Sequence, residues 1–328
     1  MNRPAKLVIT GAGHVGSYVL AEAVHSGLFA DIVVIDSDPD IAYGEALDQH
    51  HLTGVPGSFV PRVRRGDYSE CTDADVVISA AGPSMIVDPD NPDANPDRAA
   101  LAPVNGDITR GIMREVCANV ADKEAGPVLI FITNPADTIV WIAQNEFDYP
   151  EHKIFATGTM LDSSRLRRLV ADDLGISPDS VDGYMMGEHG MAAFPVLSHL
   201  SVAGIPAARL GEYFPGAQLD SEDLAERVVE AAYQVFHSKG WTNAGVAASA
   251  MRLARAVLLD ERAIFPVSTT LHGEYGYDGD VAVSLPCLIG RSGVLRRVPV
   301  DLDDWETKAL EKSVAAVKRA IEDSAQNL

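Results

Sequence analysis

The sequence is poor in long apolar runs. Of its 328 residues, 47% are hydrophobic, yet no uninterrupted apolar run approaches the length of a membrane span. The first six residues also lack the apolar core of a signal peptide. We therefore expect no membrane partner and a cytoplasmic location.

Cysteine is scarce as well, with Cys71, Cys117 and Cys287 alone in the whole sequence. Their number is odd, they are scattered, and they are not spaced as metal ligands. This pattern is typical of reduced thiols in a cytoplasmic protein. It predicts no metal site.

Positively charged residues are also scarce. The sequence has 26 Lys and Arg residues but 47 Asp and Glu residues, which gives a net charge of −21. Such a balance argues against nucleic acid and anionic membranes as partners. If the ligands are anionic, a few local arginines must overcome an unfavourable overall field.

Glycine, in contrast, is concentrated in a turn after the first apolar run, residues 7–9. Gly11 permits a tight turn, Gly13 lets a pyrophosphate approach the backbone, and Gly16 lets a strand and a helix pack closely. The N-terminus of the following helix offers free N–H groups and partial positive charge to the pyrophosphate. We predict a dinucleotide site in this turn, formed by Gly11, Gly13, His14, Val15 and Gly16.

A second apolar strand, residues 31–35, ends on Asp36, twenty residues after Gly16. A carboxylate at this place can accept both ribose hydroxyls of an adenosine and repels a 2′-phosphate. The alternative is a capping or surface aspartate. We favour the first interpretation, which predicts NAD rather than NADP as the cofactor.

Apolar strands alternate with helical periodicity through the first half, which indicates a doubly wound parallel sheet of the Rossmann type. We expect its strands at residues 7–9, 31–35, 60–63, 75–79, 128–133 and 152–156. This regular pattern ends near residue 157. We therefore divide the chain into an α/β dinucleotide-binding domain, residues 1–157, and a mixed α+β domain for the substrate, residues 158–328. In the second domain we expect helices at about 162–174, 221–238, 244–258 and 310–321, and strands at 264–271, 281–285 and 294–300.

Small and polar residues follow two of the predicted strands, where open α/β sheets bind ligands. Ala81 and Gly82 would let a cofactor lie against the backbone, and Asn134 is either a turn residue or a hydrogen-bond partner for a ligand. We interpret Asp137 as the N-cap of the next helix. Residues 84–98, with three prolines and four aspartates, resemble a binding loop or a disordered segment.

Three polar side chains in the second half suggest chemistry. His189 is a lone histidine between Gly187 and Gly190. Asp162 and Arg165 are three residues apart, so both project from one side of the first turn of a helix. The alternative for this pair is an N-cap aspartate beside a surface arginine, and Arg98 could likewise be a solvated loop charge.

These stretches together resemble the L-lactate and malate dehydrogenase family over essentially the whole chain. Each motif alone is modest, but their order and spacing are highly specific. Arg98 precedes Asn105 by the interval that this family shows between its mobile-loop arginine and an asparagine, which favours a catalytic lid. The motifs are GAGHVG (11–16) with Asp36, GDY (66–68), TNPAD (133–137), GTMLDSSR (158–165), GEHG (187–190) and KGWT (239–242).

The resemblance implies a role for each side chain. His189 would exchange a proton with a 2-oxo acid as hydride moves to or from NAD, and Asp162 would orient its ring. Arg165 would bind the substrate carboxylate in two-pronged fashion, and Arg98 would polarise the carbonyl. Further substrate contacts are expected from Asn134, Thr242 and Met85. Further NAD contacts are expected from Ala81, Gly82, Asn105, Thr133 and Asn134.

The loop after Gly82 departs from ordinary lactate and malate dehydrogenases. It is several residues longer, and it offers apolar side chains at residues 85–87 where malate dehydrogenases place a second arginine. It looks most similar to the loop of L-2-hydroxyisocaproate dehydrogenases. We therefore expect an NAD-dependent L-2-hydroxyacid dehydrogenase of the L-lactate or L-2-hydroxyisocaproate type, assembled as a homotetramer or homodimer. The alternatives are a malate dehydrogenase and a catalytically idle NAD-binding protein with the same fold.

Overall fold

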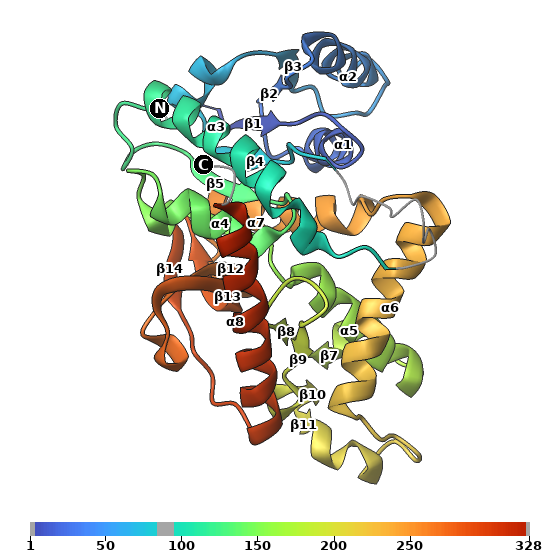
Figure 1. Cartoon of the computed structure of the whole chain (residues 1–328). Helices are drawn as coiled ribbons and strands as arrows, with labels where there is room; N and C mark the ends of the chain where they lie inside the picture. The colour runs from blue at the N-terminus through green and yellow to red at the C-terminus, as the bar shows by residue number, and fades with distance from the viewer. Residues whose placement is uncertain (1–3, 84–94, 326–328) are drawn as a thin grey trace.

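A single large sheet forms the centre of the molecule (Figure 1). The computed structural model describes residues 4–83 and 95–325. Within them the strands of this sheet follow the order β14-β13-β12-β6-β5-β4-β1-β2-β3. The six from β6 to β3 are parallel and have the strand order of a doubly wound dinucleotide-binding sheet. Their bounds are β1 Lys6–Thr10, β2 Asp31–Ile35, β3 Arg62–Arg65, β4 Val76–Ser79, β5 Val128–Phe131 and β6 Ile154–Ala156.

Helices cover both faces of the parallel strands, which explains why these strands are apolar almost throughout. Leu7 and Ile9 of β1 pack into one core with α1 (Gly16–Ser26) and α7 (Ala244–Leu258). Val8 points the opposite way, into a second core with α3 (Ala102–Asn119) and α4 (Ala136–Asn145). The predicted doubly wound sheet is thereby confirmed. On the outer part of the sheet, α2 (Pro39–Leu52) packs against β3.

The sheet continues beyond β6 into the second half of the chain. There β12 (Ala263–His272) pairs antiparallel with β6, where Ser268 lies opposite Ala156. β13 (Asp278–Gly290) and β14 (Gly293–Arg297) complete this antiparallel extension. Besides α7 and short 3₁₀ turns, the second half also contains α5 (Met160–Leu174), α6 (Ser221–Lys239), α8 (Asp304–Ser324) and five two-residue strands. The predicted mixed second half is confirmed, although its short strands gave too brief a pattern to be foreseen.

The short strands form two small sheets, β11-β10-β7 and β8-β9. Their bounds are β7 Val181–Asp182, β8 Met185–Met186, β9 Phe194–Pro195, β10 Ser201–Val202 and β11 Ile205–Pro206. Other bounds also differ from expectation: β3 lies two residues later than predicted, β14 ends three residues earlier, and both β13 and α8 extend beyond their predicted ranges at each end. Among the described helices, none is both long enough and apolar enough to cross a membrane.

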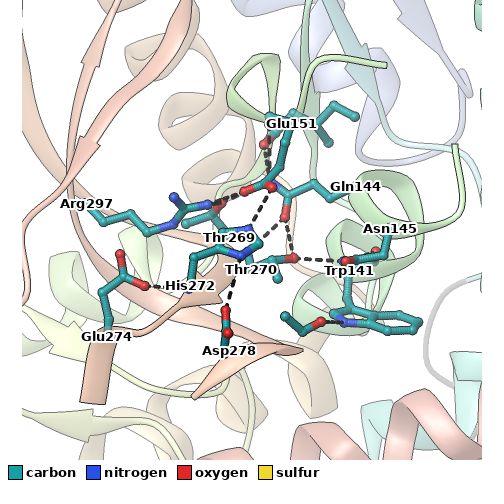
Figure 2. A network of polar contacts seen from close by, with 12 residues as sticks. Trp141, Gln144, Asn145, Glu151, Thr269, Thr270, His272, Glu274, Asp278 and Arg297 are labelled. Atoms are coloured by element: carbon teal, nitrogen blue, oxygen red, sulfur yellow. Dashed lines mark hydrogen bonds and ion pairs between the residues drawn. The ribbon is translucent and has the colours of Figure 1, made fainter. Parts of the chain in front are cut away.

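A polar network joins α4 to the antiparallel extension (Figure 2). At its centre the buried Gln144 donates to the carbonyl of Ile154 at 2.7 Å and to Thr269 Oγ1 at 2.9 Å, and its Oε1 accepts from the backbone and hydroxyl of Thr270. Glu151 accepts from Arg297 and from His272 nearby. Because these bonds satisfy groups on three elements at once, Gln144 fixes β12 against α4.

We predict that Gln144→Leu destabilises the fold by on the order of 3 kcal/mol, because it leaves several buried donors and acceptors without partners. Urea unfolding followed by tryptophan fluorescence measures this loss. Gln234→Leu is the matched control, since it removes an amide from an exposed position of α6. We expect that control to change stability by no more than about 0.5 kcal/mol, and equal losses in both variants would refute the central role of Gln144.

Candidate active site

His189 lies in a tight segment directly after β8, and the glycine at residue 187 makes that segment possible. Gly187 has φ +88 and pairs through its backbone with Ser284 of β13. A side chain at this position would clash with the hydroxyl of Ser313 and with the ring of Phe194. The glycine thus lets the chain pass close to β13 and α8 and present His189 to the pocket.

The ring of His189 is held by Asp162. The Nδ1 atom lies 2.6 Å from Asp162 Oδ2, while Asp162 Oδ1 accepts from Arg165 Nη1 at 2.9 Å. Burial raises the pKa of Asp162, but the charges of His189, Arg165 and Arg98 outweigh it and hold the pKa of that carboxyl well below its usual range. An ionised Asp162 keeps the proton on Nδ1, which leaves Nε2 directed away from it.

Asp162 is not the N-cap of α5, which is Thr159. It stands in the first turn with its carboxylate turned inward, only 5% exposed. The alternative of a capping aspartate with a surface arginine is therefore wrong, since Arg165 is also largely buried.

Asp137 corrects another expectation. Pro135 occupies the N-cap position of α4, and the Asp137 side chain makes no capping bond. Instead its Oδ2 accepts from the backbone N–H of His189 at 2.7 Å, and its Oδ1 accepts from Ser268 Oγ at 2.5 Å. A carboxyl group after a proline turn looks like a cap in the sequence, and the partner that decides its role is 52 residues away. His189 is thus held by one carboxyl group at its ring and by another at its backbone.

Burial has a large effect on Asp137. It raises the pKa of Asp137 to about 7, although the bonds from Ser268 and the His189 backbone act in the opposite direction. The pKa of the neighbouring Glu188 is also raised by burial, and its carboxylate accepts from the backbone of Ala192. Asp137 therefore carries less negative charge near neutral pH than an exposed aspartate would.

Two arginines face the histidine across a pocket. Arg98 begins the 3₁₀ turn Arg98–Leu101, and its Nη1 lies 3.3 Å from His189 Nε2. Arg165 lines the same pocket from α5. Among its described lining residues the pocket contains both arginines and no acidic side chain. This is the local positive site that an anionic ligand requires in so acidic a protein. The described lining is Val15, Ala80, Gly82, Pro83, Arg98, Leu101, Ile132, Thr133, Asn134, Leu161, Arg165, His189, Phe236, Gly240, Trp241, Thr242 and Val246.

Most of the predicted substrate residues meet at this pocket. Arg98, Asn134, Arg165, His189 and Thr242 all line it. Met85 lies outside the described residues. The side-chain Oδ1 of Asn134 is buried and has no hydrogen-bond partner among the described residues, so a donor on a ligand would satisfy it.

The glycine turn reaches the same pocket through Val15, which lines it. A side chain at Gly16 would clash with the carbonyl of Gly11, and one at Gly11 would lie 2.6 Å from the backbone of Ala81. A side chain at Gly13 would meet nothing within 4 Å. Gly11 and Gly16 therefore allow close packing, whereas Gly13 leaves open space. In addition, the first turn of α1 holds no acidic residue that would repel a pyrophosphate.

Asp36 reaches this turn from the end of β2. Its Oδ2 accepts from the backbone N–H of Ala12 at 2.7 Å, and its Oδ1 accepts from the backbone N–H of Asp38 at 2.9 Å. The carboxylate thus supports the turn and retains lone pairs for a ligand. Both interpretations of Asp36, structural and ligand-binding, are compatible with this position.

The remaining cofactor candidates surround the ends of β4 and β5. Thr133 Oγ1 donates to the carbonyl of Ala81 at 2.9 Å, and Asn105 Nδ2 donates to the carbonyl of Asn134 at 2.6 Å. Gly82 has φ +136, and a side chain there would clash with the amide of Asn105. The glycine turn, Asp36 and this cluster provide space, hydroxyl acceptors and an open helix terminus, all of which fit a dinucleotide.

Two contacts of the site had no signal in the sequence. Ser268 lies in the middle of an apolar strand, and nothing local ties it to Asp137. The rings of His14 and Trp241 are stacked, although 226 residues separate them along the chain. Both contacts exist because the fold brings remote segments together.

We predict that Asp137→Asn changes how stability depends on pH. Because burial raises the pKa of Asp137 from 3.8 to about 7, the unfolded chain ionises first, and this group costs folding free energy increasingly as pH rises through that window. Asparagine has no such cost, and it can still accept from His189 and donate to Ser268. We therefore expect the Tm of the variant minus the Tm of the unchanged protein to become larger as the pH is raised from 5 to 8.

Asp40→Asn is the control for that measurement, because it removes the same charge from the exposed first turn of α2. A Tm difference for Asp137→Asn that stays constant from pH 5 to pH 8 would contradict the raised pKa.

Comparison with known proteins agrees with this geometry. Residues 5–156 match the NAD-binding domain of the lactate/malate dehydrogenases, and residues 159–328 match their α/β C-terminal domain. The chain is 39% identical to L-lactate dehydrogenase 2 of Clostridium acetobutylicum over 317 residues, which is 96% of each chain.

Solved structures give the same result. The minor L-lactate dehydrogenase of Enterococcus mundtii superimposes with a TM-score of 0.87 at 32% identity, covering 98% of this chain and 99% of the other. Malate dehydrogenase of Cryptosporidium parvum superimposes with a TM-score of 0.88 at 27% identity, covering 99% and 100%. The backbone alone therefore does not separate the two activities. The chain belongs to the lactate/malate dehydrogenase family, and its first half is an NAD-binding domain.

Proposed function

We propose that the protein is an NAD-dependent L-2-hydroxyacid dehydrogenase of the L-lactate or L-2-hydroxyisocaproate type. The observation that carries this proposal is the histidine–aspartate pair His189–Asp162, which faces two arginines in a pocket without described acidic residues. The pocket thus contains side chains suited to proton transfer, to carboxylate binding and to carbonyl polarisation. An idle NAD-binding protein would have no chemical need for this set.

His189 is the proton donor and acceptor in this proposal. With Asp162 bonded to Nδ1, the opposite nitrogen Nε2 gives its proton to the 2-oxo oxygen during reduction and removes it during oxidation. Asp162 stabilises the positive charge of the ring before the proton leaves. Asp137 holds the backbone of the same residue, so ring and main chain are both fixed.

The two arginines divide the binding of the substrate. Arg165, which Asp162 holds by a single bond to Nη1, retains other guanidinium N–H groups for the substrate carboxylate. Arg98 lies beside His189 Nε2 and polarises the carbonyl that receives the proton. The Nε atom of Arg98 is buried and has no partner among the described residues, so it is available to a ligand oxygen.

NAD supplies the hydride acceptor, and NADH the hydride, in this reaction. The glycine turn and the N-terminus of α1 would hold its pyrophosphate, and Asp36 its adenosine ribose. The rest of the dinucleotide would be bound at the ends of β4 and β5, by Ala81, Gly82, Asn105, Thr133 and Asn134.

The choice of substrate rests on charge. A dicarboxylate such as oxaloacetate needs a further cation, because an unpaired buried carboxylate costs several kcal/mol. Residues 84–97 contain no Lys or Arg, and the described lining offers only Arg98 and Arg165. Thr242 and Trp241, together with Met85 of the loop, would instead surround an apolar side chain. The malate dehydrogenase alternative is therefore disfavoured.

We also propose a cytoplasmic location. The three cysteines are free thiols, and burial raises the pKa of both Cys71 and Cys287 to about 12. Such thiols stay protonated and inert, as expected of structural cysteines in a reducing compartment.

We predict that pyruvate or a larger apolar 2-oxo acid is reduced at least about tenfold more efficiently than oxaloacetate. NADH oxidation followed by absorbance, with pyruvate, 2-oxoisocaproate, phenylpyruvate and oxaloacetate, measures the values of kcat/KM.

In His189→Asn we expect turnover to fall about a hundredfold or more while NADH still binds. Oxaloacetate as the best substrate, or near-normal turnover in the variant, would overturn the proposal.

We further predict a higher kcat/KM for NADH than for NADPH, because Asp36 would meet a 2′-phosphate with like charge. Asp36→Asn keeps an acceptor for the Ala12 N–H and removes the charge, so it should narrow this preference. Asp38→Asn is the control, since it removes a neighbouring exposed charge and keeps a good N-cap for α2. Equal use of both cofactors by the unchanged protein would refute the role of Asp36.

A further inference from the structure

The imidazole ring of His14 is stacked on the indole ring of Trp241. The ring centroids are 3.8 Å apart and the ring planes differ by 9°. His14 belongs to the glycine turn, whereas Trp241 lies in the loop of residues 240–243 between α6 and α7. The stack therefore joins the predicted cofactor turn to a loop that lines the substrate pocket.

A hydrogen bond supports the same junction. Asn243 is buried, and its Nδ2 lies 3.4 Å from the backbone carbonyl of His14. The Oδ1 atom of Asn243 accepts from Lys239 Nζ at 2.7 Å and from the backbone of Ala244. Because these two donors occupy Oδ1, the amide nitrogen is turned toward His14. The loop is thus attached to His14 at its ring and at its backbone.

The loop is bounded by the ends of two helices. Gly240 has φ +87 and ends α6, and α7 begins at Ala244, where packing against α1 takes over. Trp241 and Thr242 lie between these points and line the pocket. The position of Trp241 consequently sets how closely this wall approaches a substrate side chain.

We infer that His14 is a positioning residue for substrate specificity: by stacking on Trp241 it holds the pocket wall formed by Trp241 and Thr242 against the variable group of the substrate. This inference rests on the proposed function. Without the ring of His14, Trp241 is free to turn, the wall recedes, and bulkier 2-oxo acids gain relative to pyruvate.

The test compares kcat/KM for 2-oxoisocaproate and for pyruvate at saturating NADH. In His14→Ala we expect the ratio of these two values to rise about three- to tenfold, as expected for loss of one aromatic pair, mainly through KM. His14→Phe keeps a flat ring against Trp241, so its ratio should stay within about twofold of the unchanged protein. His25→Ala is the control, since it removes an exposed histidine of α1 whose hydrogen bond among the described residues is to the carbonyl of Ala21 in the same helix.

A purely structural stack would lower the Tm and leave the substrate ratio unchanged. A ratio in His14→Ala within about twofold of the unchanged protein therefore overturns the inference, as does an equal shift in His14→Phe. The NADH dissociation constant, measured by fluorescence, separates a weakened cofactor site from an altered wall. If the unchanged protein reduces no 2-oxo acid, the proposed function itself fails, whereas activity with an unchanged ratio sinks the inference alone.

Discussion

The active site depends on the hydrogen bond between Asp162 and the ring of His189. A buried carboxylate is costly unless it is paired, and Asp162 is paired with both His189 and Arg165. The bond can form only if α5 and the segment after β8 pack in one register. Asp137 imposes the same requirement on α4 and the His189 backbone. Because Asp162 lies on α5 and Asp137 on α4, the packing of these two helices determines the position of the His189 ring.

The same arrangement solves the problem set by the net charge of −21. Arg98 and Arg165 line the pocket, whereas the acidic groups near His189 are turned toward other partners: Asp137 to the His189 backbone and Ser268, and Glu188 to the backbone of Ala192. Burial raises the pKa of Asp137 to about 7, which reduces the negative charge that a bound carboxylate would meet near neutral pH. Local geometry, rather than overall composition, decides the sign of the site.

Sequence patterns were sufficient wherever a local rule decides the structure. Near-continuous apolar runs predicted the buried parallel strands, and glycine spacing predicted the turn at residues 11–16. They failed where a distant partner decides the outcome. Asp137 was interpreted as a cap because its neighbours form a turn, yet its bonds go to His189 and Ser268. The two-residue strands β7 to β11 are likewise products of packing, since so short a segment has no detectable period.

Neighbouring residues of the glycine turn, Gly13 and His14, contribute to different parts of the site. Gly13 leaves open space at the N-terminus of α1, where a pyrophosphate fits, and the next residue fills space by stacking on Trp241. Adjacent residues of one turn thus face open space, which the proposed function assigns to the cofactor, and a wall of the pocket. Gly11 and Gly16 pack the turn closely against the backbone of Ala81 and against the turn itself, which leaves its backbone little room to move. In the proposed enzyme, residues 13 and 14 would therefore link the cofactor site to the wall that limits the substrate side chain, although the residues of the reaction itself lie elsewhere in the chain.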